Sequence, residues 1–292
     1  MAALTSNPTV TSPPASRPPG ALTVRIEPPH GWFELRLKEL WAYRELLYFL
    51  VWRDVKVRYK QTAIGVSWVI VQPLLTMLVA TLFFGRLAKL PSQGLPYSVF
   101  CFAAIVPWTY FSGALTAATN VMVENQRVIT KVYFPRLILP VAATLSGLVD
   151  FAIGFVVLLI FTFSYGIRPT WALLLLPLFL LLAIFTVLGV GLWLSALNAL
   201  YRDVKYLTPF LVQFWTLASP VYYSSSMVPE RYRWLYGLNP MAGVIDGFRW
   251  GLTATGHPPA AGFFASFAIV IILTLGGLLF FNRMEGNIAD KV

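Results

Sequence analysis

Long apolar runs constrain the fold of this chain more than any other feature of its sequence. A membrane-spanning helix needs about 20 predominantly apolar residues, with a usual range of about 17–25. Six runs approach this length, at residues 66–84, 97–118, 137–165, 172–196, 206–223 and 262–281. The third is long enough to tilt in the bilayer, and the fifth is short and contains Pro209 and Pro220. We therefore expect an all-α integral membrane protein with six transmembrane helices.

The composition agrees with a lipid environment rather than water. Of the 292 residues, 58% are hydrophobic and 12% are charged. Soluble domains average about 45–50% apolar and about 25% charged residues. The single cysteine, Cys101, lies in an apolar run, and one thiol cannot form an internal disulfide. We expect a small buried hydrophobic residue there, with a reactive thiol as the alternative.

The sequence lacks the motifs that would indicate catalysis. Neither a G-x-x-x-x-G-K-[ST] phosphate loop nor a G-x-G-x-x-G loop is present. Both histidines, His30 and His257, stand beside prolines outside the apolar runs, and no Cys/His cluster could hold zinc. We therefore expect this chain to bind no cofactor or metal and to have no enzyme activity of its own.

The chain divides into three regions. Residues 1–31 contain seven of the 21 prolines and are expected to form a disordered tail. Residues 32–61 mix charged and aromatic residues, which is typical of an amphipathic helix at the membrane interface; an ordinary helix packed on protein is the alternative. Residues 62–292 hold the apolar runs and form the transmembrane domain. The tryptophans expected at headgroup depth are Trp32, Trp41 and Trp52.

Basic residues indicate how the chain is inserted. The segments on the side of the two termini hold 16 of the 22 Lys and Arg residues, and the opposite side holds 6. Because basic loops stay in the cytoplasm, both termini are expected there. Residues 53–61 form a dense basic cluster, and an anionic leaflet would attract each of its cations by about 1 kcal/mol. A purely solvated run of charges is the alternative.

Asp150 is the clearest charge within a span, near the middle of the third apolar run. A carboxylate at the bilayer centre costs about 2.5–3.5 kcal/mol on insertion scales, so it should face the protein interior or water. Its role is a structural hydrogen bond, a place in the channel lining, or proton coupling. A proton relay needs several such groups, and a single aspartate gives it little support.

Two semi-polar segments stand out between the spans. Residues 228–256 are too charged for lipid and too apolar for a simple loop, which predicts short re-entrant helices covered by protein or a water-filled cavity. Residues 120–140 alternate polar and apolar positions near helical spacing until Pro135. This pattern predicts an amphipathic helix on the cytoplasmic face, which either touches only lipid or inserts into a soluble partner.

Aromatic residues gather near the outer ends of the spans. They form either an interfacial belt or a lining on which sugar rings stack. Trp108 follows Pro107 within a span and lies deeper than a belt residue should, which favours the sugar interpretation there. The group comprises Trp108, Tyr110, Phe111, Trp215, Tyr222, Tyr223, Trp234 and Tyr236.

The segment RDVKVRYKQTAIGVSWVIVQPLL (53–75) closely resembles the start of ABC-2 type permeases that export lipid-linked O-antigen or related polysaccharides. Teichoic-acid and capsule exporters are similar. Further similar segments are ENQRVITKVYFPRLILP (124–140), YRDVKYLTP (201–209) and LNPM (238–241), so the resemblance covers roughly residues 32–290. The residues that carry it in the first segment are Arg53, Asp54, Arg58, Tyr59, Lys60, Gln61, Gly65, Trp68 and Pro73.

The resemblance implies a homodimer of six-span protomers in the cytoplasmic (inner) membrane of a bacterium. Two copies of a separate ATPase would bind beneath it and supply ATP and Mg. The loop after the second span would be a coupling helix, and residues 228–256 would lie near the outer face. The contacts of the coupling helix with the ATPase would come from Val121, Glu124, Asn125, Arg127, Thr130, Lys131 and Tyr133.

The cargo implied by the resemblance is a polysaccharide linked to undecaprenyl diphosphate. The aromatic group and Asp150 would line its channel, and the charges of Arg53, Arg58 and Lys60 would attract its diphosphate or anionic membrane lipids. Export of a drug or a simple lipid is the alternative on the same fold. A membrane-embedded transferase would need clustered acids, a metal or a nucleotide motif, and no nucleic-acid partner is expected.

Overall fold

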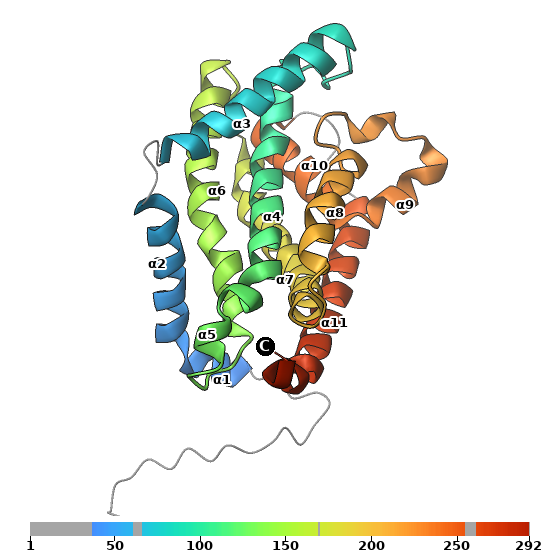
Figure 1. Ribbon diagram of the computed structural model, residues 1–292. Helices are drawn as coiled ribbons and strands as arrows, with labels where there is room; N and C mark the ends of the chain where they lie inside the picture. Colours follow the sequence, from blue (N-terminus) through green and yellow to red (C-terminus); the bar gives the residue numbers. More distant parts are fainter. Residues whose placement is uncertain (1–36, 61–65, 169, 255–260, 292) are drawn as a thin grey trace, which may run out of the picture. The chain divides into compact units, whose positions relative to one another are not determined.

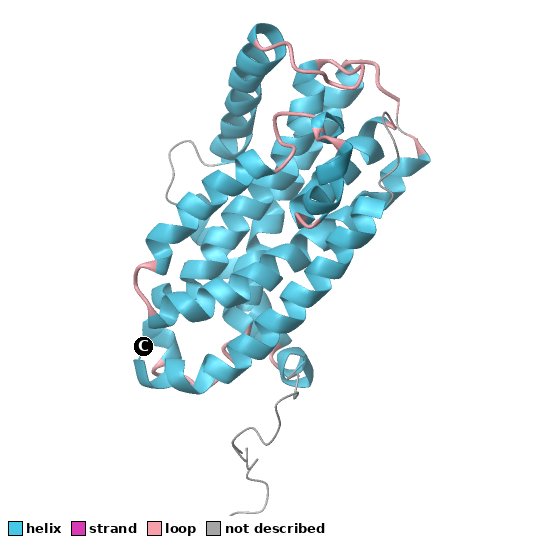
Figure 2. Ribbon diagram, turned by 90° about the vertical axis from the view of Figure 1, so that its right-hand side faces the viewer, coloured by secondary structure: helices cyan, strands magenta, loops and turns pink. Residues whose placement is uncertain are grey.

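The computed structural model describes residues 37–60, 66–168, 170–254 and 261–291 (Figure 1). Within these ranges all regular elements are helical and no strand occurs (Figure 2). The expected all-α fold is therefore confirmed. The predicted disordered tail, residues 1–31, and Trp32 lie outside the described residues.

Five helical segments in the described ranges are long and apolar enough to cross a membrane. The chain is accordingly a multi-pass membrane protein. Three are continuous α-helices, one ends in a π-helical turn and one begins with a 3-10 turn. They comprise α3 (Val66–Ala80) with the π-helical η1 (Thr81–Leu87), α4 (Tyr97–Glu124), α6 (Ile138–Ser164), the 3-10 helix η2 (Trp171–Leu175) with α7 (Leu176–Leu200), and α11 (Ala261–Lys291).

The remaining apolar run forms a shorter helix than the sequence predicted. α8 spans Val204–Ala218, and its 15 residues measure about 22 Å, less than the hydrocarbon thickness of about 30 Å. The helix ends where Ser219 takes an extended conformation directly before Pro220, whose ring cannot continue it. The predicted span 206–223 therefore ends earlier, and a sixth crossing stays a prediction.

α4 forms the centre of the bundle. It packs against α3, α6, α7, α8 and α10 (Pro240–Thr253). In its most apolar window 78% of the residues are buried, whereas the corresponding window of Ser67–Leu87 is 17% buried. The segment formed by α3 and η1 therefore leaves most of its side chains free to contact lipid or another chain.

Glycines bring α7 and α11 into direct backbone contact. A Cβ on Gly277 would lie 2.6 Å from the carbonyl oxygen of Gly189, so a larger residue at Gly277 requires the backbones to move apart. A Cβ on Gly189 would lie 3.0 Å from the Thr274 amide nitrogen, which also makes a tight contact. Beside this contact Trp193 stacks on Phe280 with ring centroids 4.5 Å apart. Small residues at the crossing and an aromatic pair beside it are typical of helix packing in membranes.

The N-terminal segment is helical, as predicted, but bends once. α1 (Leu37–Ala42) and α2 (Arg44–Lys60) meet at Tyr43, and α2 lies against α6 (Figure 1). The side chains that α2 and its approach leave exposed include Trp41, Tyr48, Phe49 and Trp52. Exposed aromatics and a protein-facing side suit an interfacial position, which stays a prediction.

Residues 225–253 form short helices, as the semi-polar sequence predicted. η3 (Ser225–Met227), η4 (Glu230–Tyr232) and α9 (Arg233–Gly237) precede α10. α10 begins where the Asn239 side chain accepts a hydrogen bond from the Met241 amide at 3.1 Å, with Pro240 in the first turn. Its many buried residues pack against α4, α7 and α11. Re-entry of these helices into the bilayer stays a prediction.

Candidate functional site

The C-terminal turn of α2 places Arg58 and Tyr59 directly on Asp150 of α6. Arg58 Nη1 donates to Asp150 Oδ2, and the Tyr59 hydroxyl donates to Asp150 Oδ1. A second Arg58 nitrogen, Nη2, lies 3.5 Å from Ser146 Oγ. Two residues that the sequence assigned to different tasks, Arg58 to a lipid headgroup and Asp150 to the channel, therefore form one ion pair.

Tyr59 strengthens this arrangement as a hydrogen-bond donor. Burial and the bond to Asp150 raise the pKa of its phenol, so the group keeps its proton at neutral pH. Asp150 thus receives one charged and one neutral donor from α2. A carboxylate in a span needs such partners. The basic cluster at residues 53–61 was the sequence signal that could have identified them.

Two cavities flank Arg58. The larger has a volume of about 470 Å³ and lies between α2, α3, α4 and α6, with Asp150, Gln72 and Tyr110 among its lining residues. The second, of about 390 Å³, continues toward the end of α4 and includes Arg53 and Glu124. Arg53 is bound by its neighbour Asp54 at 2.8 Å, so two of the three predicted anion-binding residues carry carboxylate partners. Lys60 is exposed.

The predicted amphipathic helix after the second span has a different form. α4 itself continues to Glu124, and a separate helix, α5 (Gln126–Ile129), has only 4 residues. The expectation of one amphipathic helix over this segment was therefore wrong. The break is set by Asn125, whose side-chain amide bonds back to the Val121 carbonyl at 2.9 Å.

The predicted coupling residues separate into buried and exposed groups. Val121 and Asn125 are buried, so they shape the turn rather than face outward. Beyond it, Arg136 Nη1 donates to the Glu285 carbonyl of α11 at 2.7 Å, which fixes the far end of the segment. The exposed members are Glu124, Arg127, Thr130, Lys131 and Tyr133.

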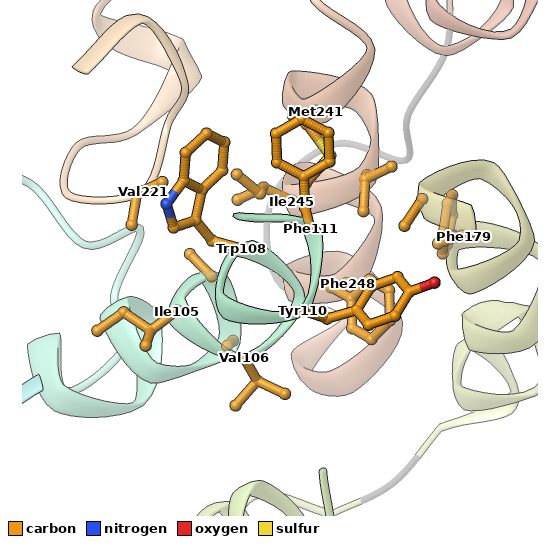
Figure 3. Close-up of a cluster of buried hydrophobic side chains, with 14 of the residues drawn as sticks. Ile105, Val106, Trp108, Tyr110, Phe111, Phe179, Val221, Met241, Ile245 and Phe248 are labelled. Atoms are coloured by element: carbon orange, nitrogen blue, oxygen red, sulfur yellow. The ribbon is translucent and has the colours of Figure 1, made fainter. Parts of the chain in front are cut away.

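The aromatic group predicted to line a channel also divides. Trp108 and Phe111 are buried where α4 faces α10, close to Ile245 and Met241 (Figure 3). Their rings lie 5.2 Å apart. In this conformation both are core residues. The sequence of an apolar span does not show whether an aromatic residue lies in the core or lines a channel.

The other aromatics lie toward the segment that follows α8. Trp215 Nε1 donates to Asn239 Oδ1 at 2.8 Å, and the Tyr236 hydroxyl donates to the Tyr223 hydroxyl at 3.2 Å. Trp215 and Tyr236 border an apolar cavity of about 470 Å³. Tyr222 and Trp234 line none of the three cavities described here. Tyr222 stacks on Phe84 with ring centroids 5.3 Å apart, and Trp234 is 69% exposed.

Sequence reasoning missed the role of Arg249. It is 2% exposed, and its three guanidinium nitrogens donate to three carbonyl oxygens, those of Phe100 at 3.1 Å, Val221 at 2.9 Å and Tyr223 at 3.2 Å. Burial lowers the pKa of Arg249 to about 10, so the group remains charged at neutral pH. An arginine in an otherwise apolar helix was the available signal.

In the described part of the chain, no group of three or more His, Cys, Asp or Glu residues could hold a metal ion. The site offers ion pairs, hydroxyls, an amide and aromatic rings around cavities, together with an exposed polar segment at the end of α4. Such an arrangement suits binding of a ligand.

A family model described as ABC-2 type transporter matches residues 45–253, well over half of the chain. The chain belongs to this family. The resemblance inferred from the sequence motifs is thereby confirmed, and the chain is a transporter membrane subunit rather than a catalytic enzyme.

Curated relatives match nearly the full length. The O-antigen export system permease protein RfbA of Myxococcus xanthus is 27% identical over 258 residues, which cover 88% of this chain and 98% of the relative. The protein of the same name from Klebsiella pneumoniae is 27% identical over 250 residues, which cover 84% of this chain and 94% of the relative.

Proposed function

We propose that this chain is the permease subunit that exports an undecaprenyl-diphosphate-linked, O-antigen-like polysaccharide across the cytoplasmic membrane of a bacterium. The observation that carries the proposal is the near full-length match to permeases named for O-antigen export, at 98% and 94% of their lengths. A match that extends through the spans and the connecting segments supports a shared task better than a match to the spans alone.

A homodimer with six spans per protomer fits the exposed face of α8. Tyr206, Phe210, Phe214 and Leu217 recur at helical spacing and are all exposed. A second copy would cover this apolar stripe, and the non-helical residues after Ala218 would complete the crossing. Both termini would then lie in the cytoplasm, as the distribution of basic residues predicts.

Two copies of a separate ATPase would supply the energy, with ATP and Mg bound to that subunit. The contact would come from the exposed residues Glu124, Arg127, Thr130, Lys131 and Tyr133. Val121 and Asn125 would act from beneath by holding the turn between α4 and α5. The bond between Arg136 and α11 supports this function because it prevents the segment from moving alone.

The cargo would pass beside the aromatic residues of the outer half and the cavity at Asp150. Tyr110 already borders that cavity, and Trp215, Tyr222, Tyr223, Trp234 and Tyr236 lie toward the segment after α8. Trp108 and Phe111 could meet the cargo only after the interface between α4 and α10 separates. At the cargo's diphosphate, Lys60 is available directly, whereas Arg53 and Arg58 would exchange a carboxylate for phosphate.

The cargo is tested in the native host by deleting the chain and restoring it as a tagged protein. The proposal predicts undecaprenyl-linked polymer trapped inside the deleted strain and an ATPase that co-purifies with the tagged chain. An ATPase without trapped glycan would instead favour export of a drug or a simple lipid. Absence of both would refute energy coupling through a partner.

Coupling is tested by reversing charge in the exposed segment. Glu124→Lys and Lys131→Glu should each leave ATP hydrolysis by the complex in place while export falls by about tenfold, because like charges would meet across the contact. Arg231→Glu, an equally exposed reversal in the segment before α9, is the matched control and should export normally. Normal export by both coupling variants would refute this assignment.

A further inference from the structure

The cavity between α2, α3, α4 and α6 has the size and lining of a small-molecule site. Its volume is about 470 Å³, within the range of about 300–1,000 Å³ typical of such sites. Asp150 lies on its wall, 12 residues and hence about 18 Å along α6 from Ile138. Charged side chains on the wall of a cavity this far along a spanning helix should face water or a polar ligand.

The charges at this cavity cancel each other. The Asp150 carboxylate accepts from both Arg58 and Tyr59, and the side chains of the ion pair are 36% and 27% exposed. The pair therefore presents a strong donor and a strong acceptor side by side without net charge. A phosphate could bond to Arg58 only by replacing the Asp150 carboxylate, whereas a neutral ligand with several hydroxyls can bond to both groups while the pair stays intact.

Two further polar groups on the wall lack a partner. Within the described residues, nothing bonds to the side-chain amide of Gln72 or to the hydroxyl of Thr109, although both line the cavity. A hydroxyl in a spanning helix ordinarily bonds to the carbonyl four residues earlier, as Thr116 does to Ser112 at 2.8 Å. Both residues are exposed, so the amide and the hydroxyl can supply donors and acceptors to a ligand in the cavity.

Aromatic surface completes the wall. Trp68 of α3 lines the cavity and is 53% exposed. Tyr110 of α4 and Phe151 of α6 also line it, with their rings edge to face at 5.8 Å. Aromatic faces stack on the C–H faces of a pyranose ring while its hydroxyls reach the surrounding polar groups.

We propose that this cavity is a sugar-binding site that holds one neutral pyranose unit of the exported glycan. Asp150 and Arg58 bond to its hydroxyls, Gln72 and Thr109 bond to others, and Trp68 covers one face of the ring. The inference rests on the proposed export of a polysaccharide and adds a place where the chain grips it. Tyr110 is the member of the predicted aromatic group that borders this site.

Gly113 allows the cavity to be filled without disturbing the ion pair. It lines the cavity, and a Cβ built on it meets no atom within 4 Å. Gly113→Phe therefore places a ring in the space proposed for the sugar. Val156→Phe is the matched control, because Val156 lies on the neighbouring α6, is 55% exposed and does not line this cavity.

The test is saturation-transfer difference NMR on the full chain with its ATPase in phospholipid nanodiscs. The probes are the methyl pyranosides of glucose, mannose, galactose and rhamnose. We expect a signal from at least one of them with the wild type and Val156→Phe, and the level of empty nanodiscs with Gly113→Phe. Gln72→Ala should weaken the same signal while leaving the cavity open.

Three results would overturn the site. They are equal signals from wild type and Gly113→Phe, no signal from any pyranoside with the wild type, and a signal that undecaprenyl phosphate removes but a second pyranoside does not. The last would make the cavity a lipid-phosphate site. Export is scored independently by trapped glycan in the deleted strain, so the cavity can fail while the export function stands.

Discussion

Arg58 and Arg249 are both arginines held against the helix bundle, but their partners differ in kind. Arg249 is buried, donates to the carbonyls of Phe100, Val221 and Tyr223, and lies 3.6 Å from the centre of the Phe100 ring. Arg58 is partly exposed between two cavities and depends on a single carboxylate and a distant hydroxyl.

The difference shows what each arginine can contribute. Carbonyls belong to the backbone and cannot rotate away, so Arg249 fixes the segment after α8 against α4 and α10. A carboxylate on one helix and a guanidinium on another can exchange partners when a ligand arrives. The buried cation therefore has a structural role, whereas the cation beside the cavities is placed where a ligand could reach it.

Removing the buried cation should have the largest effect. Arg249→Met leaves three carbonyls without their donor, and Asp246, 3.8 Å from the guanidinium, without its nearest cation. Breaking such a buried arrangement costs about 3–5 kcal/mol. Thermal unfolding in detergent, followed by size-exclusion chromatography, should show early loss of the folded peak. The control Arg231→Met changes an exposed position and should unfold at the same temperature as the wild type. Equal unfolding temperatures of Arg249→Met and Arg231→Met would contradict the structural role of Arg249.

Replacing each arginine by lysine should lower the stability of the protein by different amounts at positions 249 and 58. An ammonium group cannot reproduce a planar fork, so Arg249→Lys should lose about 1–3 kcal/mol for the acceptors it leaves unpaired. Arg58→Lys keeps a charge opposite Asp150 and should lose much less. The same unfolding assay measures both. A larger loss at position 58 than at position 249 would reverse the comparison.

The smallest effect concerns the energy of the ion pair itself. A double-mutant cycle of Arg58→Met and Asp150→Asn should give a coupling energy of about 1 kcal/mol, because polar contacts between membrane helices are modest and this pair is partly exposed. Denaturant unfolding of the four proteins measures it. Additive single effects would show that the pair contributes no mutual stabilisation, whereas several kcal/mol would give it a structural role like that of Arg249.

The sequence predicted the spanning helices well, because apolar length alone determines them. The second and third runs were expected at 97–118 and 137–165, and the helices span Tyr97–Glu124 and Ile138–Ser164. α8 differs because its end depends on the backbone at Ser219. The segment after α4 differs because Asn125 bonds to the helix it follows, a local contact that periodicity cannot reveal.

The candidate site was only partly predictable. Arg58, Asp150 and Tyr110 were each chosen from charge or aromatic character. Their meeting at one cavity depends on the packing of three helices, and Arg58 and Asp150 are 92 residues apart in the chain. Trp108 and Phe111 were predicted to line a channel because aromatic residues gather near the outer ends of the spans, but both are buried. A helix that is apolar on every face does not indicate which face meets protein. Gln72, Trp68 and Gly113 become notable only once the cavity that they share is known.

The glycine contact between α7 and α11 has a mechanical consequence. A carbon added at Gly277 would lie 2.6 Å from the Gly189 carbonyl oxygen, so rotation that brings a larger side chain into this crossing would cause a clash. We therefore expect α7 and α11 to move together as a rigid pair. We expect larger movements where α2 and α3 meet their neighbours, because those contacts include side chains that can rotate and the ion pair between Arg58 and Asp150.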